Sequence, residues 1–296
     1  MAYTAAHENA AAVSTGRPSV RSIAVSRALL ALVLVEIVIL FLPALRWLID
    51  RWTMSVWHNA HGMFTAVLVA FFIGRQLRQA RHLPISSSAW GFAFVIPALV
   101  VHTLDAAMHT QLLAAVSLVL ILPGLSLLFL GVERTRLITF PLAFAALVLP
   151  IPLALTESFQ MRLREVTTLG TAAIIPRLGV PVFAEGTTLH LPNVSLLVSD
   201  ACSGFSTLYA AVVVASLTAY STTSLRRRIL VMTIAPLIAV AANIVRVSLL
   251  SLLVNWRGGE VLGTWLHPAS GMLTFVLALP IIFWLGGPSR TAEART

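Results

Sequence analysis

The sequence predicts an all-α fold, a polytopic bundle of about eight transmembrane helices. Of the 296 residues, 58% are hydrophobic and only 10% are charged. A soluble domain carries about 25% charged residues, so this chain lacks the polar surface that a soluble fold needs. Long apolar runs, such as 28–42 and 272–285, lie in segments of the roughly 20 residues that cross a bilayer.

The apolar segments place the expected spans in order along the chain. We expect spans near residues 26–48, 57–74, 89–105, 111–131, 137–155, 202–220, 229–253 and 267–286. The first 20 residues are polar and lack the short apolar core of a signal peptide, so the first span is expected to be retained.

The 20 basic residues are all arginines, and most of them lie between the spans. Five clusters fall on one side of an eight-span bundle: 17–27, 75–81, 134–136, 226–228 and 290–295. Arginine-rich loops face the cytoplasm, so both ends, residues 1–25 and 287–296, are expected there. This loop pattern, in a single membrane domain over residues 1–296, argues against nucleic-acid binding despite the net charge of +9.

The longest outer segment, residues 156–200, is too polar to span a membrane. Residues 161–175 mix apolar and charged positions at near-helical spacing, which predicts an amphipathic interfacial helix. Glycines and prolines in 179–186 indicate turns, and the partial alternation in 187–198 predicts a short hairpin. We expect a small extracytoplasmic cap between the fifth and sixth spans.

Cys202 is the only cysteine, and it lies where this polar segment enters the sixth span. One cysteine excludes an internal disulfide and a cysteine-rich metal site, and no cofactor is expected. A thiolate is a strong nucleophile, and the N-terminal end of a helix favours the ionised form. Taken alone, the residue is also compatible with inert packing.

Arg246 lies within the seventh span and is flanked by apolar residues. An arginine at this depth costs about 2.5–3.5 kcal/mol on insertion scales, so it faces a cavity, pairs with a partner or reaches the interface. Asn243 precedes it by three residues and lies on the same helix face. The pair therefore presents a cation and an amide to one point.

His267 opens the eighth span, and the ordinary pKa of histidine, near 6.5, suits it to proton transfer. An interfacial histidine without a chemical role is the alternative. In an eight-span bundle the sixth and eighth spans begin at the outer face and the seventh ends there. Cys202, Arg246 and His267 are therefore expected at the outer face. We expect His267 to activate the thiol and protonate the leaving amine, while Arg246 and Asn243 stabilise the oxyanion.

Weaker candidates surround these three residues. His58 and His61 lie at the outer start of the second span, and their spacing alone is a poor signal for a metal. We expect His61 to line the cavity of Cys202. Asp200 is expected to cap the helix or contact the substrate, and Gly204 to allow close approach of a substrate backbone.

In these residues the chain resembles the exosortase/archaeosortase family of membrane cysteine transpeptidases. The family pattern is a Cys-Ser-Gly run at a helix entry, then an Asn-x-x-Arg helix, then a His that opens the next helix. The matching segments here are 200–204, 243–246 and 267–271, with further likeness at 61–62, 149–152 and 179–186. The likeness spans roughly residues 50–286, and residues 205–208 depart from the Leu-Arg-Ser-Leu-like run of many members.

The resemblance implies roles for the site residues. It implies Cys202 as nucleophile with Arg246 and His267 as its catalytic partners, supported by Asn243, Asp200, Ser203, Gly204 and His61. It also implies a substrate: an exported protein with a C-terminal sorting signal, made of a motif such as Pro-Glu-Pro, a membrane helix and an Arg-rich tail. Cleavage would occur on the periplasmic side of a bacterial inner membrane, with transfer to a surface acceptor, in a process linked to exopolysaccharide.

Two other function classes fit the composition. A non-enzymatic membrane component of polysaccharide export or assembly would make Cys202 replaceable. A transporter would need broken helices and paired intramembrane charges, for which the sequence offers Glu36 and Arg246.

Overall fold

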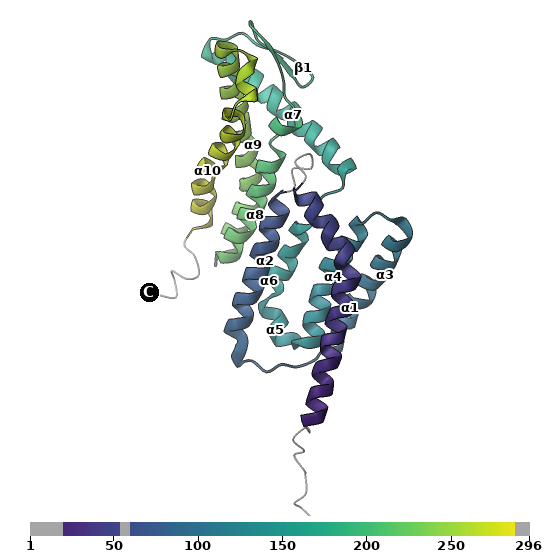
Figure 1. Ribbon diagram of the computed structural model, residues 1–296. Coiled ribbons are helices and arrows are strands. Elements are labelled where there is room, and N and C mark those ends of the chain that lie inside the picture. The colour runs from purple at the N-terminus through teal and green to yellow at the C-terminus, as the bar shows by residue number, and fades with distance from the viewer. Residues whose placement is uncertain (1–19, 54–59, 288–296) are drawn as a thin grey trace, which may run out of the picture. The chain divides into compact units, whose positions relative to one another are not determined.

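The computed structural model describes residues 20–53 and 60–287 (Figure 1). His58, residues 1–19 of the expected cytoplasmic N-terminus and residues 288–296 of the expected tail lie outside the described residues. The contacts within the chain form two units, Met1–Pro43 and Ala44–Thr296. The first contains the N-terminal part of helix α1, and the second contains every residue of the site.

The described residues are mainly helical, as the sequence predicts. The α-helices are α1 (Val20–Thr53), α2 (Ala60–Gln79), α3 (Phe92–Met108), α4 (Leu112–Phe129), α5 (Gly131–Leu137), α6 (Thr139–Phe144), α7 (Leu153–Ile174), α8 (Phe205–Ser221), α9 (Leu225–Arg257) and α10 (Leu266–Gly286).

Within the described part of the chain, five helical segments are long and apolar enough to cross a membrane. They are Ala31–Thr53, Ala89–Met108, Leu112–Phe129, Leu225–Arg257 and Ala269–Gly286. Shorter apolar helical segments cover Thr139–Val148 and Phe205–Ser221. These helices support a multi-pass membrane protein, and the total of eight spans stays a prediction.

The expected fifth span, 137–155, is not one continuous helix. Helix α6 passes into a 3-10 turn, η4 (Ala145–Val148), and the helical segment ends there. Leu149 then adopts an extended conformation with ψ 134°, because the ring of the following Pro150 disfavours a helical residue before it. After Pro152 the chain re-enters a helix, so residues 161–174 of the expected amphipathic segment 161–175 are part of the longer α7, and Ile175 begins a 3-10 turn.

Between α7 and α8 the chain forms a three-stranded antiparallel sheet in the order β1-β2-β3. The expected hairpin in 187–198 is present as β2 (Thr188–His190) and β3 (Ser195–Leu197). Strand β1 (Phe183–Glu185) falls in a segment expected to hold only turns, and it is joined to β2 through Gly186 at φ +57°. The sheet packs against α7.

Helices α8, α9 and α10 pack against one another, and α9 also packs against α7 (Figure 1). The buried core between these three helices is made largely of small side chains: Ala211, Ala215, Val231, Ala235, Ala239 and Ile282. Alanines allow helix backbones to approach closely in a membrane, where van der Waals contact is a main source of association. This close packing fixes where α9 and α10 place their polar residues.

We expect Ala235→Leu to weaken the packing of α9, because Ala235 is 0% exposed and has no room for three further carbons. Overpacking of this kind costs about 1–3 kcal/mol. Thermal unfolding in detergent should show a lower midpoint for this variant. Leu237→Ala, at a side chain 63% exposed on the same helix, is the control and should unfold near the wild-type temperature. Equal midpoints for Ala235→Leu and the wild-type protein would contradict the close packing.

Candidate active site

Cys202 lies on a short 3-10 turn, η6 (Asp200–Cys202), that joins the sheet to α8. The side chain is buried, at 8% exposure. Helix α8 begins at Phe205, so Cys202 lies just before this helix, near the expected start of the sixth span. The intervening Gly204 has φ +81°, which breaks the helix between them.

The Cys202 side chain lines a cavity of about 220 Å³. His267 and Ser199 contribute the other polar side chains, and apolar residues of β3, α9 and η7 (Gly259–Gly263) complete the walls. The thiol thus lies in a small, mostly apolar cavity.

Asn243 holds the Cys202 turn against α9. Its side-chain amide donates hydrogen bonds to the Cys202 carbonyl oxygen at 3.0 Å and to Thr167 Oγ1 at 3.1 Å. Asn243 is 2% exposed, so these bonds are made away from water. Because an amide has two N–H donors, both are used inside the protein, and Asn243 has none left for an oxyanion. This geometry gives Asn243 a positioning role.

Gly204 makes the approach of Asn243 possible. A Cβ atom at residue 204 would lie 2.6 Å from Asn243 Cγ, which is closer than carbon atoms pack. The positive φ of Gly204 also disfavours any residue with a side chain. The glycine therefore serves the approach of Asn243 within the protein, where the sequence had suggested the approach of a substrate backbone.

His267 lies in the first turn of α10 and faces the thiol. Its Nε2 atom is 3.8 Å from Cys202 Sγ, within the range of a hydrogen bond to sulfur. The Nδ1 atom is buried and has no hydrogen-bond partner among the described residues. The ring is therefore not oriented by a carboxylate at Nδ1, in contrast to a Ser-His-Asp arrangement.

Arg246 fixes the start of α10 and brings a positive charge to the site. Its Nε atom donates to Ser270 Oγ at 3.0 Å, and its Nη2 atom donates to the His267 carbonyl oxygen at 3.3 Å. Gly271 leaves room for the guanidinium, since a Cβ there would lie 3.3 Å from Arg246 Cζ. Arg246 is 7% exposed, so its charge is poorly screened by water.

Burial raises the pKa of the Cys202 thiol above its ordinary value. The charge of Arg246 and a hydrogen bond with Ser199 lower this pKa, but they offset only part of the rise. The net effect is opposite to the expected ionised thiol, because loss of hydration disfavours the charged form more than the neighbouring groups favour it.

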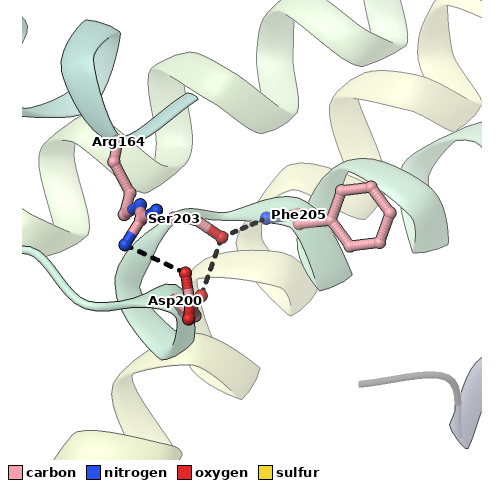
Figure 2. A network of polar contacts seen from close by, with 4 residues as sticks. All are labelled: Arg164, Asp200, Ser203 and Phe205. Atoms are coloured by element: carbon pink, nitrogen blue, oxygen red, sulfur yellow. Dashed lines mark hydrogen bonds and ion pairs between the residues drawn. The ribbon is translucent and has the colours of Figure 1, made fainter. Parts of the chain in front are cut away.

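Ser203 and Asp200 stabilise the turn that carries Cys202 (Figure 2). Ser203 Oγ donates to the Asp200 carbonyl oxygen at 2.7 Å and accepts from the Phe205 N–H at 3.3 Å. Arg164 of α7 pairs with the Asp200 carboxylate at 3.1 Å. In Figure 2 the Arg164 and Ser203 side chains both point toward Asp200. These contacts tie the turn to α7 and to the start of α8.

His61 is placed elsewhere. Its ring stacks on Tyr209 of α8 with 3.7 Å between the ring centroids, and it does not line the Cys202 cavity. Among the described residues, no group of three or more His, Cys, Asp or Glu side chains is arranged to hold a metal ion.

Three residues of this site were missed in the sequence: Arg164, Thr167 and Ser270. Ser270 follows His267 by three residues, so its place on the same helix face was readable from the spacing. Arg164 and Thr167 lie on α7, and no local pattern connects them to a turn about 35 residues later. The structure thus brings Cys202, His267, Arg246 and Asn243 together and leaves His61 apart.

The arrangement offers a nucleophile, a proton acceptor in contact with it and a buried cation beside both. Comparison with known families adds a match over most of the chain. A family model described as transmembrane exosortase (Exosortase_EpsH) matches residues 52–284. No curated protein and no solved structure matches the chain.

We expect alkylation of Cys202 in detergent-solubilised protein to speed up only at alkaline pH. Since burial raises the thiol pKa, the thiolate fraction is small at neutral pH and grows as pH rises through that pKa. Arg246→Gln removes a charge that favours the thiolate, so the midpoint of its alkylation rate against pH should lie at still higher pH. Arg246→Lys keeps the charge, so its midpoint should shift less. As the chain has one cysteine, maleimide labelling against pH reports this thiol alone. A midpoint below that of a free cysteine would contradict the burial argument.

We expect Gly204→Ala to destabilise the protein by about 1–3 kcal/mol, because a positive φ and a contact with Asn243 both oppose a side chain. The matched control is Gly74→Ala in α2, where a Cβ meets nothing within 4 Å. Thermal unfolding should separate the two variants. A wild-type midpoint for Gly204→Ala would show that the turn adapts without this constraint.

Proposed function

Because the chain belongs to the transmembrane exosortase family, we propose that it is a membrane-embedded cysteine transpeptidase or protease with Cys202 as nucleophile. The observation that carries this proposal is the 3.8 Å approach of His267 Nε2 to Cys202 Sγ inside a cavity. A buried packing cysteine needs no proton acceptor beside it, whereas nucleophilic catalysis requires one.

The first chemical step follows from the state of the thiol. Because burial raises the pKa of Cys202, the resting thiol keeps its proton, and His267 Nε2 accepts that proton as sulfur attacks the carbonyl carbon. The tetrahedral intermediate carries a negative oxygen. Arg246 supplies the nearest buried positive charge, which favours this intermediate over the neutral substrate.

The second step releases the C-terminal part of the substrate. His267 returns the proton to the leaving amine, and the product is a thioester between Cys202 and the new C-terminal carbonyl. Water would resolve this thioester by hydrolysis, and an acceptor amine or hydroxyl would resolve it by transfer. Arg246 holds the His267 carbonyl oxygen, so it also acts as a positioning residue for the base.

We further propose the substrate class that the resemblance to the exosortase family implies. The substrates would be exported proteins that carry a short C-terminal motif of the Pro-Glu-Pro type, a membrane helix and an Arg-rich tail. The reaction would take place at the extracytoplasmic face of a bacterial inner membrane, with the cap of β1–β3 beside the site. Attachment of the product to an exopolysaccharide-linked surface acceptor is the expected outcome.

We expect Cys202→Ala and Cys202→Ser to lower processing of a tailed substrate at least about 10³-fold, because each removes the thiolate that attacks the carbonyl. The test is complementation of a deletion strain of the source organism, with the substrate followed by immunoblot. Ser206→Ala is the control, since Ser206 is an exposed side chain on the first turn of α8. An adduct that joins Cys202 to the substrate and is cleaved by hydroxylamine should accumulate in the wild-type protein.

Full processing by Cys202→Ala would overturn the mechanism. It would favour the second function class, a non-enzymatic component of polysaccharide export or assembly, in which Cys202 is replaceable. Membrane abundance of each variant, measured in the same strain, separates a chemical defect from a loss of protein.

A further inference from the structure

Strand β3 forms one edge of the three-stranded sheet. Among the described residues its one partner strand is β2, and Leu197 at its end is 60% exposed. An edge strand presents backbone N–H and C=O groups that a further extended chain can pair with. This edge is therefore available for pairing with a further extended chain.

The register shows which backbone groups point outward. The N–H of Leu191 donates to the Val194 carbonyl oxygen, and the N–H of Val198 donates to the Thr187 carbonyl oxygen. In an antiparallel pair the hydrogen-bonded residues alternate, so residues 194, 196 and 198 direct their backbone groups toward β2. The backbone groups of Ser195 and Leu197 therefore point toward the open edge.

This edge leads directly to the nucleophile. Leu196, Leu197, Val198 and Ser199 line the cavity that also contains Cys202 and His267. Strand β1, at the opposite edge, contributes no residue to that cavity. A chain that paired with β3 would thus have one end at the thiol.

The size and lining of the cavity restrict the ligand. Its volume of about 220 Å³ is below the roughly 300–1,000 Å³ of sites that enclose whole small molecules. Val247, Leu250 and Leu262 make the facing wall apolar. The cavity therefore suits a single small or apolar side chain of a longer ligand whose backbone lies outside it, which favours a polypeptide over a sugar.

We propose that the substrate polypeptide binds in an extended conformation as a fourth strand along β3. It pairs with the N–H and C=O of Leu197 and brings its scissile carbonyl to Cys202. This proposal rests on the proposed function and adds how that site recognises its substrate. Backbone pairing supplies affinity, and the cavity selects one side chain, as in other modes of β-strand addition.

The test compares two substitutions at one residue. Leu197→Pro removes the outward N–H, and it spares the pairing with β2 because Leu197 directs that group away from β2. We expect it to lower processing of the tailed substrate at least tenfold, through a higher KM. Leu197→Ala keeps the N–H and removes only the side chain that lines the cavity, so Leu197→Pro should lower processing at least tenfold further than Leu197→Ala does when backbone pairing carries the affinity.

Ala184→Pro is the matched edge control. In and beside β2, the backbone N–H and C=O groups of residues 187, 189 and 191 point toward β3. Those of residues 188 and 190 therefore point toward β1, where they face Glu185 and Phe183. Ala184 therefore directs its N–H away from β2 at the opposite edge, which contributes no residue to the cavity. Its replacement by proline should leave processing unchanged.

A second measurement uses the wild-type protein and stays decisive if Leu197→Pro fails to fold. Synthetic peptides that span the cleavage motif are N-methylated at one residue at a time and tested as inhibitors of processing. Strand pairing predicts loss of inhibition at every second residue. Losses without this alternation, or wild-type processing by Leu197→Pro, would overturn the fourth-strand proposal.

The two proposals fail in different ways. If Cys202→Ala is inactive while Leu197→Pro processes normally, the fourth strand is wrong and the cysteine mechanism stands. If Cys202→Ala processes the substrate, the proposed function is wrong whatever Leu197→Pro does.

Discussion

The hydrogen bond from the Asn243 side chain to the Cys202 carbonyl oxygen is the contact on which the site depends. It joins a turn that follows the sheet to the middle of α9, and it is buried, so its loss would leave a carbonyl oxygen without a partner at a cost of about 1–3 kcal/mol. Gly204 is required next to it because no side chain fits between the turn and Asn243. The position of the thiol is thus set mainly by α9, together with the contacts that tie its turn to α7 and to the start of α8.

Helix α9 also sets the position of the histidine. Arg246 lies one turn beyond Asn243, on the same face, and bonds the His267 carbonyl oxygen and Ser270 of α10. One face of one helix therefore holds both the Cys202 turn and the start of α10 with His267, which explains why a 3.8 Å contact forms between residues 65 positions apart. The alanine-rich packing of α8, α9 and α10 holds α9 close to the two neighbouring helices.

Much of the fold follows from local pattern. The apolar helices, the hairpin of β2 and β3 and the arginines between the spans are properties of short segments, and the sequence predicts them. The break after Val148 is a local effect of Pro150 and Pro152. The continuous span expected there was wrong, because the segment is apolar throughout but the prolines interrupt the helix. Strand β1 was missed because it is three residues long and exists only by pairing with β2.

The sequence by itself determined which residues are candidates for the chemistry: a lone cysteine before an apolar helix, an arginine within another and a histidine at the start of a third. The tertiary structure alone decided their state and their contacts. It placed Cys202 outside the helix, raised the pKa of the thiol by burial, committed both N–H groups of Asn243 to Thr167 and the Cys202 turn, and moved His61 to Tyr209. Desolvation and hydrogen bonding depend on neighbours distant in the chain, and residue type and spacing do not encode those neighbours.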